Sequence, residues 1–248
     1  MAEGLNQHPL RMWTDAVLRS YSQIFFSRSR WVGGLMIAAT GFEPRMLMYG
    51  LLAVLVSVLT AKSLRFDATL VADGIYSYNA LLVGLGTAAL ISMDSIALAI
   101  LVAGSVVSVL VTAASRSGTA TNGLPILTAP FLGVYFLVVA TSTSLGLSLA
   151  LLPTGPEAGM FPDWLTLYFK SLGMIFFVPR LDAGFVLFVA LLLHSRIATL
   201  FSLAGLGVAY AVMQVSALSV LAGDVFPMLL ALNLMFTAIA LGGVWFVP

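Results

Sequence analysis

Residues 22–45 read SQIFFSRSRWVGGLMIAATGFEPR, and residues 173–196 read GMIFFVPRLDAGFVLFVALLLHSR. The two stretches align without gaps, 151 residues apart, and share an Ile-Phe-Phe triplet, a glycine and a closing arginine. A second pair follows in the same order, because NALLVGLGTAAL (79–90) is similar to NLMFTAIALGGV (233–244). Two apolar helices can align by chance, but several matched features in one order argue against chance. The sequence therefore predicts two copies of one unit.

The composition is that of a membrane protein. The chain has 248 residues, of which 60% are hydrophobic and 8% charged, and its mean hydropathy is +1.07. Soluble domains carry about a quarter charged residues, so we expect an all-α, polytopic transmembrane bundle. A net charge of +1 without a dense basic cluster gives no reason to expect a nucleic-acid partner. Cysteine is absent and only two histidines occur, so we expect no disulfide, metal site or other cofactor.

Apolar stretches follow one another along the chain, at about 31–42, 46–61, 75–92, 95–114, 124–152, 171–193, 197–222 and 225–247. Several are shorter than the ~20 residues that cross a bilayer, which predicts discontinuous half-helices beside full spans. We expect an amphipathic or interfacial segment (1–30), a first transmembrane repeat (31–152), a linker (153–165) and an incomplete second repeat (166–248). Residues 14–26 are expected to form the lead-in helix, capped by Thr14 or Asp15. Four arginines before the first span favour a cytoplasmic N-terminus in the inner membrane.

Five motifs taken in order resemble the urea transporter family. They are SQIFF (22–26), DGIYSYNALLVG (73–84), NGLPILTAPF (122–131), HSR (194–196) and NLMFTAIALGG (233–243), and the resemblance covers about 17–150 and 166–246. It implies a channel-like fold of two inverted repeats in the lipid bilayer, assembled as a homotrimer with one pore in each subunit. It also implies urea as the substrate, with short amides, water and ammonia as lesser permeants.

Urea is small, planar and neutral, and hydrogen-bond donors and acceptors surround its rim. Leaving these groups unpaired inside the membrane costs several kcal/mol each. A selective path should therefore be a flat apolar slot with a row of oxygen acceptors along one edge. Its sites should bind weakly, since a permeant must also leave them.

The resemblance assigns pore roles to seven residues: Gln23, Phe26, Tyr78, Leu82, Thr128, Phe177 and Phe236. Gln23 would offer an oxygen at the pore mouth, or else lie at headgroup depth. Tyr78 and Leu82 share a helix face and would form a slot wall, or else face lipid or a neighbouring subunit. Thr128 would line the narrow middle, or else bond its own Pro-kinked helix. Asn79, and its counterpart Asn233, are expected to be structural amides that hold a half-helix end.

The second copy departs from the pattern. Met174 stands where the first copy has Gln23, and Leu232 stands where it has Tyr78. Only 15 residues follow Asn233, so the second repeat is expected to be truncated relative to the family. Two alternatives to a urea channel follow: a non-conducting or degenerate subunit that only assembles, and a transporter of another small neutral solute.

Two other classes of function find little support. His194 and Ser195 are adjacent, so on a helix their side chains point about 100° apart, and no enzyme is expected. An ion-coupled transporter would need carboxylates within its spans. The aspartates instead lie at the edges of apolar stretches and are interpreted as helix caps: Asp73, Asp94 and Asp224. Asp182 is expected to pair with Arg180.

Overall fold

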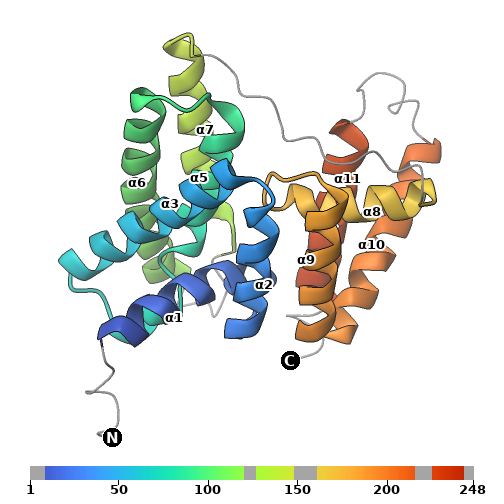
Figure 1. Ribbon diagram of the computed structural model, residues 1–248, viewed down its shortest axis with the longest axis horizontal. Helices are drawn as coiled ribbons and strands as arrows, with labels where there is room; N and C mark the ends of the chain where they lie inside the picture. Colours follow the sequence, from blue (N-terminus) through green and yellow to red (C-terminus); the bar gives the residue numbers. More distant parts are fainter. Residues whose placement is uncertain (1–8, 120–126, 148–160, 216–224, 243–248) are drawn as a thin grey trace, which may run out of the picture. The chain divides into compact units, whose positions relative to one another are not determined.

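The computed structural model describes residues 9–119, 127–147, 161–215 and 225–242 (Figure 1). These residues are predominantly helical, and no β-strand occurs among them. Within these ranges, three helices are long and apolar enough to cross a membrane, namely α3 (Pro44–Ser63), α6 (Ser95–Thr119) and α10 (Arg196–Val215). The expected all-α membrane bundle is therefore confirmed.

The chain divides into two compact units, one of Met1–Gly34 with Pro44–Leu151 and one of Leu35–Glu43 with Leu152–Pro248. Besides α3 and α6, the first unit holds α1 (Pro9–Ser22), η1 (Gln23–Phe25), α4 (Ala68–Ala72), α5 (Tyr78–Leu90), α7 (Ala129–Ser144) and the first turn of α2 (Arg30–Gly41). The second unit holds the rest of α2, α8 (Asp163–Met174), α9 (Leu181–His194), α10 and α11 (Val225–Ala240). Helix α1 packs against α3, α4 and α5, so it belongs to the body of the first unit.

Helix α5 is the interior of the first unit. It contacts α3, α6 and α7, and every residue from Tyr78 to Ala89 is buried. A helix that is apolar on all sides needs protein on all sides. With 13 residues α5 is about 20 Å long, shorter than the ~30 Å hydrocarbon core of a bilayer. The turn between α4 and α5 thus produces a discontinuous helix of the predicted kind, enclosed by longer ones.

The two copies close their first helix pair in the same way. A methyl group on Gly33 of α2 would overlap the carbonyl oxygen of Leu18 in α1. A methyl group on Gly184 of α9 would overlap the carbonyl oxygen of Phe169 in α8. Leu18 and Phe169 are separated by the same 151 residues as the two glycines. The glycine-to-carbonyl contact therefore occurs at equivalent positions in the two copies. The inversion of one copy relative to the other stays a prediction.

The apolar stretch 171–193 is divided between two helices, because residues 175–180 leave the helix between α8 and α9. One sequence-based boundary is wrong. The lead-in helix begins at Pro9, so neither expected residue caps it. The Thr14 hydroxyl donates to the Arg11 carbonyl of its own helix at 2.9 Å, and the buried Asp15 carboxylate binds Arg30 at 2.6 Å. Residues with capping chemistry here serve contacts inside and beyond the helix.

We expect Gly33→Ala to lower the free energy of unfolding by roughly 1–3 kcal/mol, since the added methyl group forces α1 and α2 apart. Gly34→Ala is the matched control, because nothing lies within 4 Å of the position its methyl group would take. Thermal unfolding of the purified variants in detergent measures both. Equal midpoints for the two alanine variants would show that α1 and α2 do not depend on this contact.

Candidate functional site

In both units the first helix closes on a phenylalanine with a left-handed backbone. Phe26 has φ 57° and Phe177 has φ 56°. The Phe26 N–H donates three residues back at 2.9 Å, and the next N–H donates five residues back at 3.0 Å. The same two bonds occur at Phe177, each at 3.0 Å. This is the Schellman arrangement, whose left-handed position usually holds glycine.

A phenylalanine in that conformation carries a cost. Left-handed backbone at a residue other than glycine stores roughly 1–3 kcal/mol, and strain of this kind collects at functional sites. Both rings are half-buried. The strain at two equivalent positions makes Phe26 and Phe177 candidates for a role that a glycine could not fill.

A polar junction ties the end of α1 to the turn before α5. The Arg19 guanidinium forms an ion pair with the Asp73 carboxylate. The Gln23 Nε2 donates to the Asp73 main-chain carbonyl at 3.1 Å, and the Ser20 and Ser77 hydroxyls lie 2.5 Å apart. The N-terminus of α5 is therefore fixed to α1 by three side-chain contacts.

A second junction ties α5 to the start of α7. The Tyr78 hydroxyl donates to the Leu127 carbonyl, and the Asn79 Nδ2 donates to the same oxygen at 3.4 Å. The Asn79 Oδ1 accepts the Phe131 N–H at 3.3 Å, and its Nδ2 also lies 3.4 Å from the Thr112 hydroxyl of α6. The Asn79 amide thus contacts the Leu127 carbonyl, the Phe131 N–H and the neighbouring helix α6.

Two of the five pore candidates of the first copy, Gln23 and Tyr78, take part in these junctions, and the other three lie near junction residues in the sequence. Gln23 and Phe26 lie half-buried after α1, and Thr128 lies half-buried at the N-cap of α7 without a side-chain capping bond. Tyr78 and Leu82 are only 8% and 5% exposed. They face the interior of the first unit, whereas a lipid-facing pair would be exposed.

The described residues of the second unit do not repeat the junctions. Helix α11 runs without a break through Leu232, and Asn233 is exposed and donates to the Leu229 carbonyl of its own helix at 2.7 Å. Met174 is buried where the first copy has Gln23. Phe236 is half-buried in α11. Asn233 therefore does not hold a half-helix end as Asn79 does.

Sequence reasoning missed the role of Asp73. It is the C-terminal cap residue of α4, as expected, and its carboxylate also pairs with Arg19. The signal was a carboxylate beside Gly74 with an arginine in the lead-in helix, but nothing in the spacing pairs residues so far apart. Asp94 does cap α6, since its Oδ1 accepts the Ala97 N–H at 2.6 Å.

The structure also tests the predictions made for the remaining aspartates and for Ser195. The expected pair is confirmed, with the Arg180 guanidinium 2.7 Å from the Asp182 carboxylate. Asp224 lies outside the described residues. Ser195 sits between α9 and α10, where its hydroxyl accepts the Ala198 N–H at 3.2 Å. The Ser195 hydroxyl therefore acts as an acceptor for a main-chain N–H at the start of α10.

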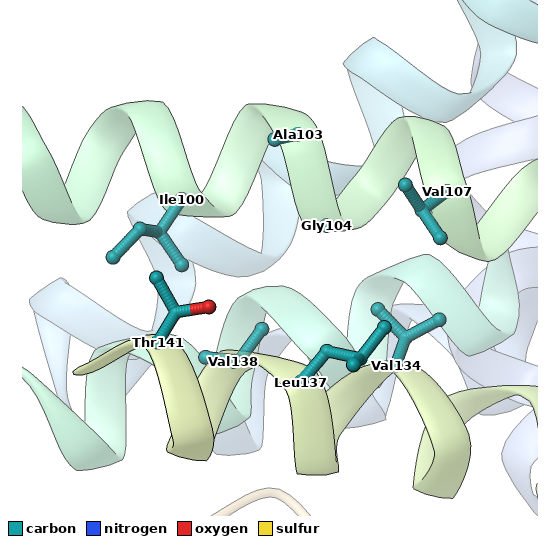
Figure 2. A pocket seen from close by; sticks show the side chains of 8 residues that line it. All are labelled: Ile100, Ala103, Gly104, Val107, Val134, Leu137, Val138 and Thr141. Carbon is teal, nitrogen blue, oxygen red and sulfur yellow. The ribbon is translucent and has the colours of Figure 1, made fainter. Parts of the chain in front are cut away.

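A cavity of about 170 Å³ lies between α6 and α7 (Figure 2). It is lined by Ile100, Ala103, Gly104, Val107, Val134, Leu137, Val138 and Thr141. Only Thr141 contributes a side-chain hydroxyl, and none of the pore candidates lines it. A polar solute would leave most of its hydrogen bonds unpaired there, so this cavity is not the candidate site.

A family model described as "UT: Urea transporter" matches residues 14–248, nearly the whole chain. A search of curated proteins found no match.

We expect Phe26→Gly to be more stable than Phe26→Ala by about 1 kcal/mol, because both lose the ring and only alanine keeps the left-handed strain. Phe136, 74% exposed in α7, is the control. There the order should reverse by about 1 kcal/mol, since glycine is the poorer helix former. Thermal unfolding in detergent measures all four variants. An alanine variant at least as stable as glycine at position 26 would contradict the strain.

Proposed function

Because the chain belongs to the urea transporter family, we propose that it is a passive channel for urea and short amides. The observation that carries this proposal is the family match over residues 14–248. Membership of this family implies passive urea transport across a membrane. The choice of path, the further permeants, assembly as a homotrimer and placement in the inner membrane are parts of the proposal.

The acceptors of the proposed path come from the first unit. Gln23 contributes its amide oxygen and Thr128 its hydroxyl, and each stands at the end of a helix that the junctions hold in place. A urea N–H that leaves water needs such an oxygen to avoid a cost of several kcal/mol. The rings of Phe26 and Tyr78 and the side chain of Leu82 would supply the flat apolar wall.

Hydrogen bonding already limits what Tyr78 can offer. Its O–H proton is donated to the Leu127 carbonyl, so to a solute it presents a ring face and an oxygen that accepts. The Leu127 carbonyl receives the Asn79 amide as well, which uses both of its lone pairs. In the proposed path, Leu127 is therefore a support and not a binding group.

The proposed contribution of the second unit is apolar. Phe177 and Phe236 would form further walls, and Met174 offers no oxygen where Gln23 stands in the first copy. This asymmetry is also the observation that favours the alternative of a non-conducting subunit. Urea flux separates the two functions, and flux of water, ammonia or acetamide without urea would identify another neutral solute as the substrate.

In proteoliposomes, we expect the protein to raise urea efflux well above that of empty vesicles. Gln23→Leu and Thr128→Val should each lower it about three- to tenfold, because a net hydrogen bond is worth ~0.5–1.5 kcal/mol and 1.4 kcal/mol is tenfold. Stopped-flow light scattering measures the efflux.

Matched controls exist for both substitutions. Gln214 is exposed on α10 and Thr141 lines the apolar cavity, so Gln214→Leu and Thr141→Val should leave efflux unchanged. Equal efflux from protein-containing and empty vesicles would contradict the proposed channel function and favour a subunit that only assembles.

We also propose that the N-terminus is cytoplasmic, and contacts in the first unit extend this to two other helix ends. The Lys62 Nζ lies 4.9 Å from the centre of the Trp13 ring, so the start of α1 meets the end of α3. The pKa of Asp67 is lowered mainly by the Thr69 hydroxyl and main-chain N–H bonds at its cap, and further by the charge of Arg116. The end of α6 therefore lies on the same side, and positive residues there agree with the positive-inside rule.

The absence of cysteine in the chain makes this orientation testable with single cysteines. Leu64 follows α3 at the proposed cytoplasmic end, and Met93 precedes α6, whose 25 residues cover about 37 Å. Both residues are exposed. A membrane-impermeant maleimide on intact cells should label Met93→Cys and should label Leu64→Cys only after permeabilisation. The reverse pattern would place the N-terminus outside.

A further inference from the structure

We propose that Asp73 is a positioning residue that orients the Gln23 carboxamide, so that its Oε1 faces the permeant as an acceptor for N–H groups. The inference rests on the proposed function, in which Gln23 stands at the mouth of the urea path. It assigns to Asp73 and its partner Arg19 a part in solute recognition without contact with the solute.

The orientation of Gln23 follows from the chemistry of its partner. The Asp73 main-chain carbonyl can only accept, so only the NH₂ end of the amide can bond it, and the distance is 3.1 Å. The Oε1 must then point away from Asp73. Among the described residues no donor is bonded to it, and the side chain is half-buried. A solute with N–H groups is the complement of such an oxygen.

Three contacts hold the Asp73 carbonyl in place. The Asp73 carboxylate pairs with Arg19 in the last turn of α1, four residues before Gln23, and both side chains are partly exposed at 21% and 26%. The Asp73 N–H donates to the Thr69 carbonyl at 2.8 Å, which closes α4. Gly74, with φ 75°, brings the turn against the backbone of Ser20, where a methyl group would not fit. These contacts hold the Asp73 carbonyl in a fixed position against α1.

The second copy lacks the counterparts of Arg19 and Gln23. Lys170 and Met174 stand where the first copy has Arg19 and Gln23. Among the described residues Lys170 has no ion pair, and methionine has no amide to orient. Of the two equivalent helix ends that the structure describes, the first therefore holds the directed acceptor, and discrimination among solutes by their N–H groups is assigned to the first unit.

The test is a double-mutant cycle on urea efflux from proteoliposomes, with Asp73→Asn, Gln23→Leu and the two together. Asparagine keeps the size and the main-chain carbonyl and removes the charge that Arg19 holds. We expect Asp73→Asn to lower efflux about three- to tenfold in the presence of Gln23 and to have no further effect once Gln23 is leucine. The exchange Arg19→Asp with Asp73→Arg restores the ion pair and should recover most of the efflux.

Asp67→Asn is the matched control, because Asp67 begins the same short helix, lies exposed and is replaced by an equally good cap. It should leave efflux unchanged. An equal loss from Asp73→Asn with glutamine and with leucine at position 23 would overturn the proposal, as would full efflux from Asp73→Asn.

Thermal unfolding of every variant accompanies the efflux. A charge exchange that restores the unfolding midpoint without restoring efflux would reduce Asp73 to a structural residue and overturn the proposal. If Gln23→Leu alone leaves efflux unchanged, the role proposed for Gln23 fails first, and the positioning of its amide fails with it.

Discussion

A main-chain carbonyl outside a regular helix must find a donor inside the protein when little water can reach it. In the first unit that carbonyl belongs to Leu127, just before α7, and Tyr78 and Asn79 supply the donors. The same asparagine accepts the Phe131 N–H, so both orphan groups depend on α5. The place of Thr128 follows from this arrangement, because it lies between the two bonded residues.

The two units share a first helix pair and then diverge. Both have a glycine pressed against a main-chain carbonyl, and both close a helix on a strained phenylalanine. Beyond that point the first unit has a turn between α4 and α5, and polar contacts with the end of α1 hold this turn in place. The second unit continues through α11 without one. The similarity of the two units therefore ends after the first helix pair, and the polar contacts before α5 belong to the first unit.

Much of the fold was open to sequence reasoning, because it rests on composition and order. The low share of charged residues predicts a membrane bundle, and the two aligned stretches predict a repeated unit. An amide alone in the apolar run after Ser77 predicts a structural contact for Asn79, although its partners could not be named. Asp182 beside Arg180 predicts a pair because the two are near neighbours, and the structure confirms it.

The remainder depends on contacts that leave no local trace. The ion pair of Arg19 with Asp73 joins residues 54 positions apart, and no periodicity reports such a distance. The left-handed phenylalanines are invisible because glycine is the signal for that backbone. Thr14 and Asp15 look like caps but are used elsewhere, since short polar side chains bond wherever a partner comes close. Tertiary contacts decided the roles of Asp73 and Asp15.

The burial of α5 on all sides isolates it from the bilayer. Variation in hydrocarbon thickness acts on helices that touch acyl chains, which tilt or adjust their ends to match it. In the first unit, α6 and α7 carry exposed apolar side chains, whereas α5 is buried from Tyr78 to Ala89. A change of lipid therefore reaches Tyr78 and Leu82 only through their neighbours, and membranes of different thickness should present them with nearly the same surroundings.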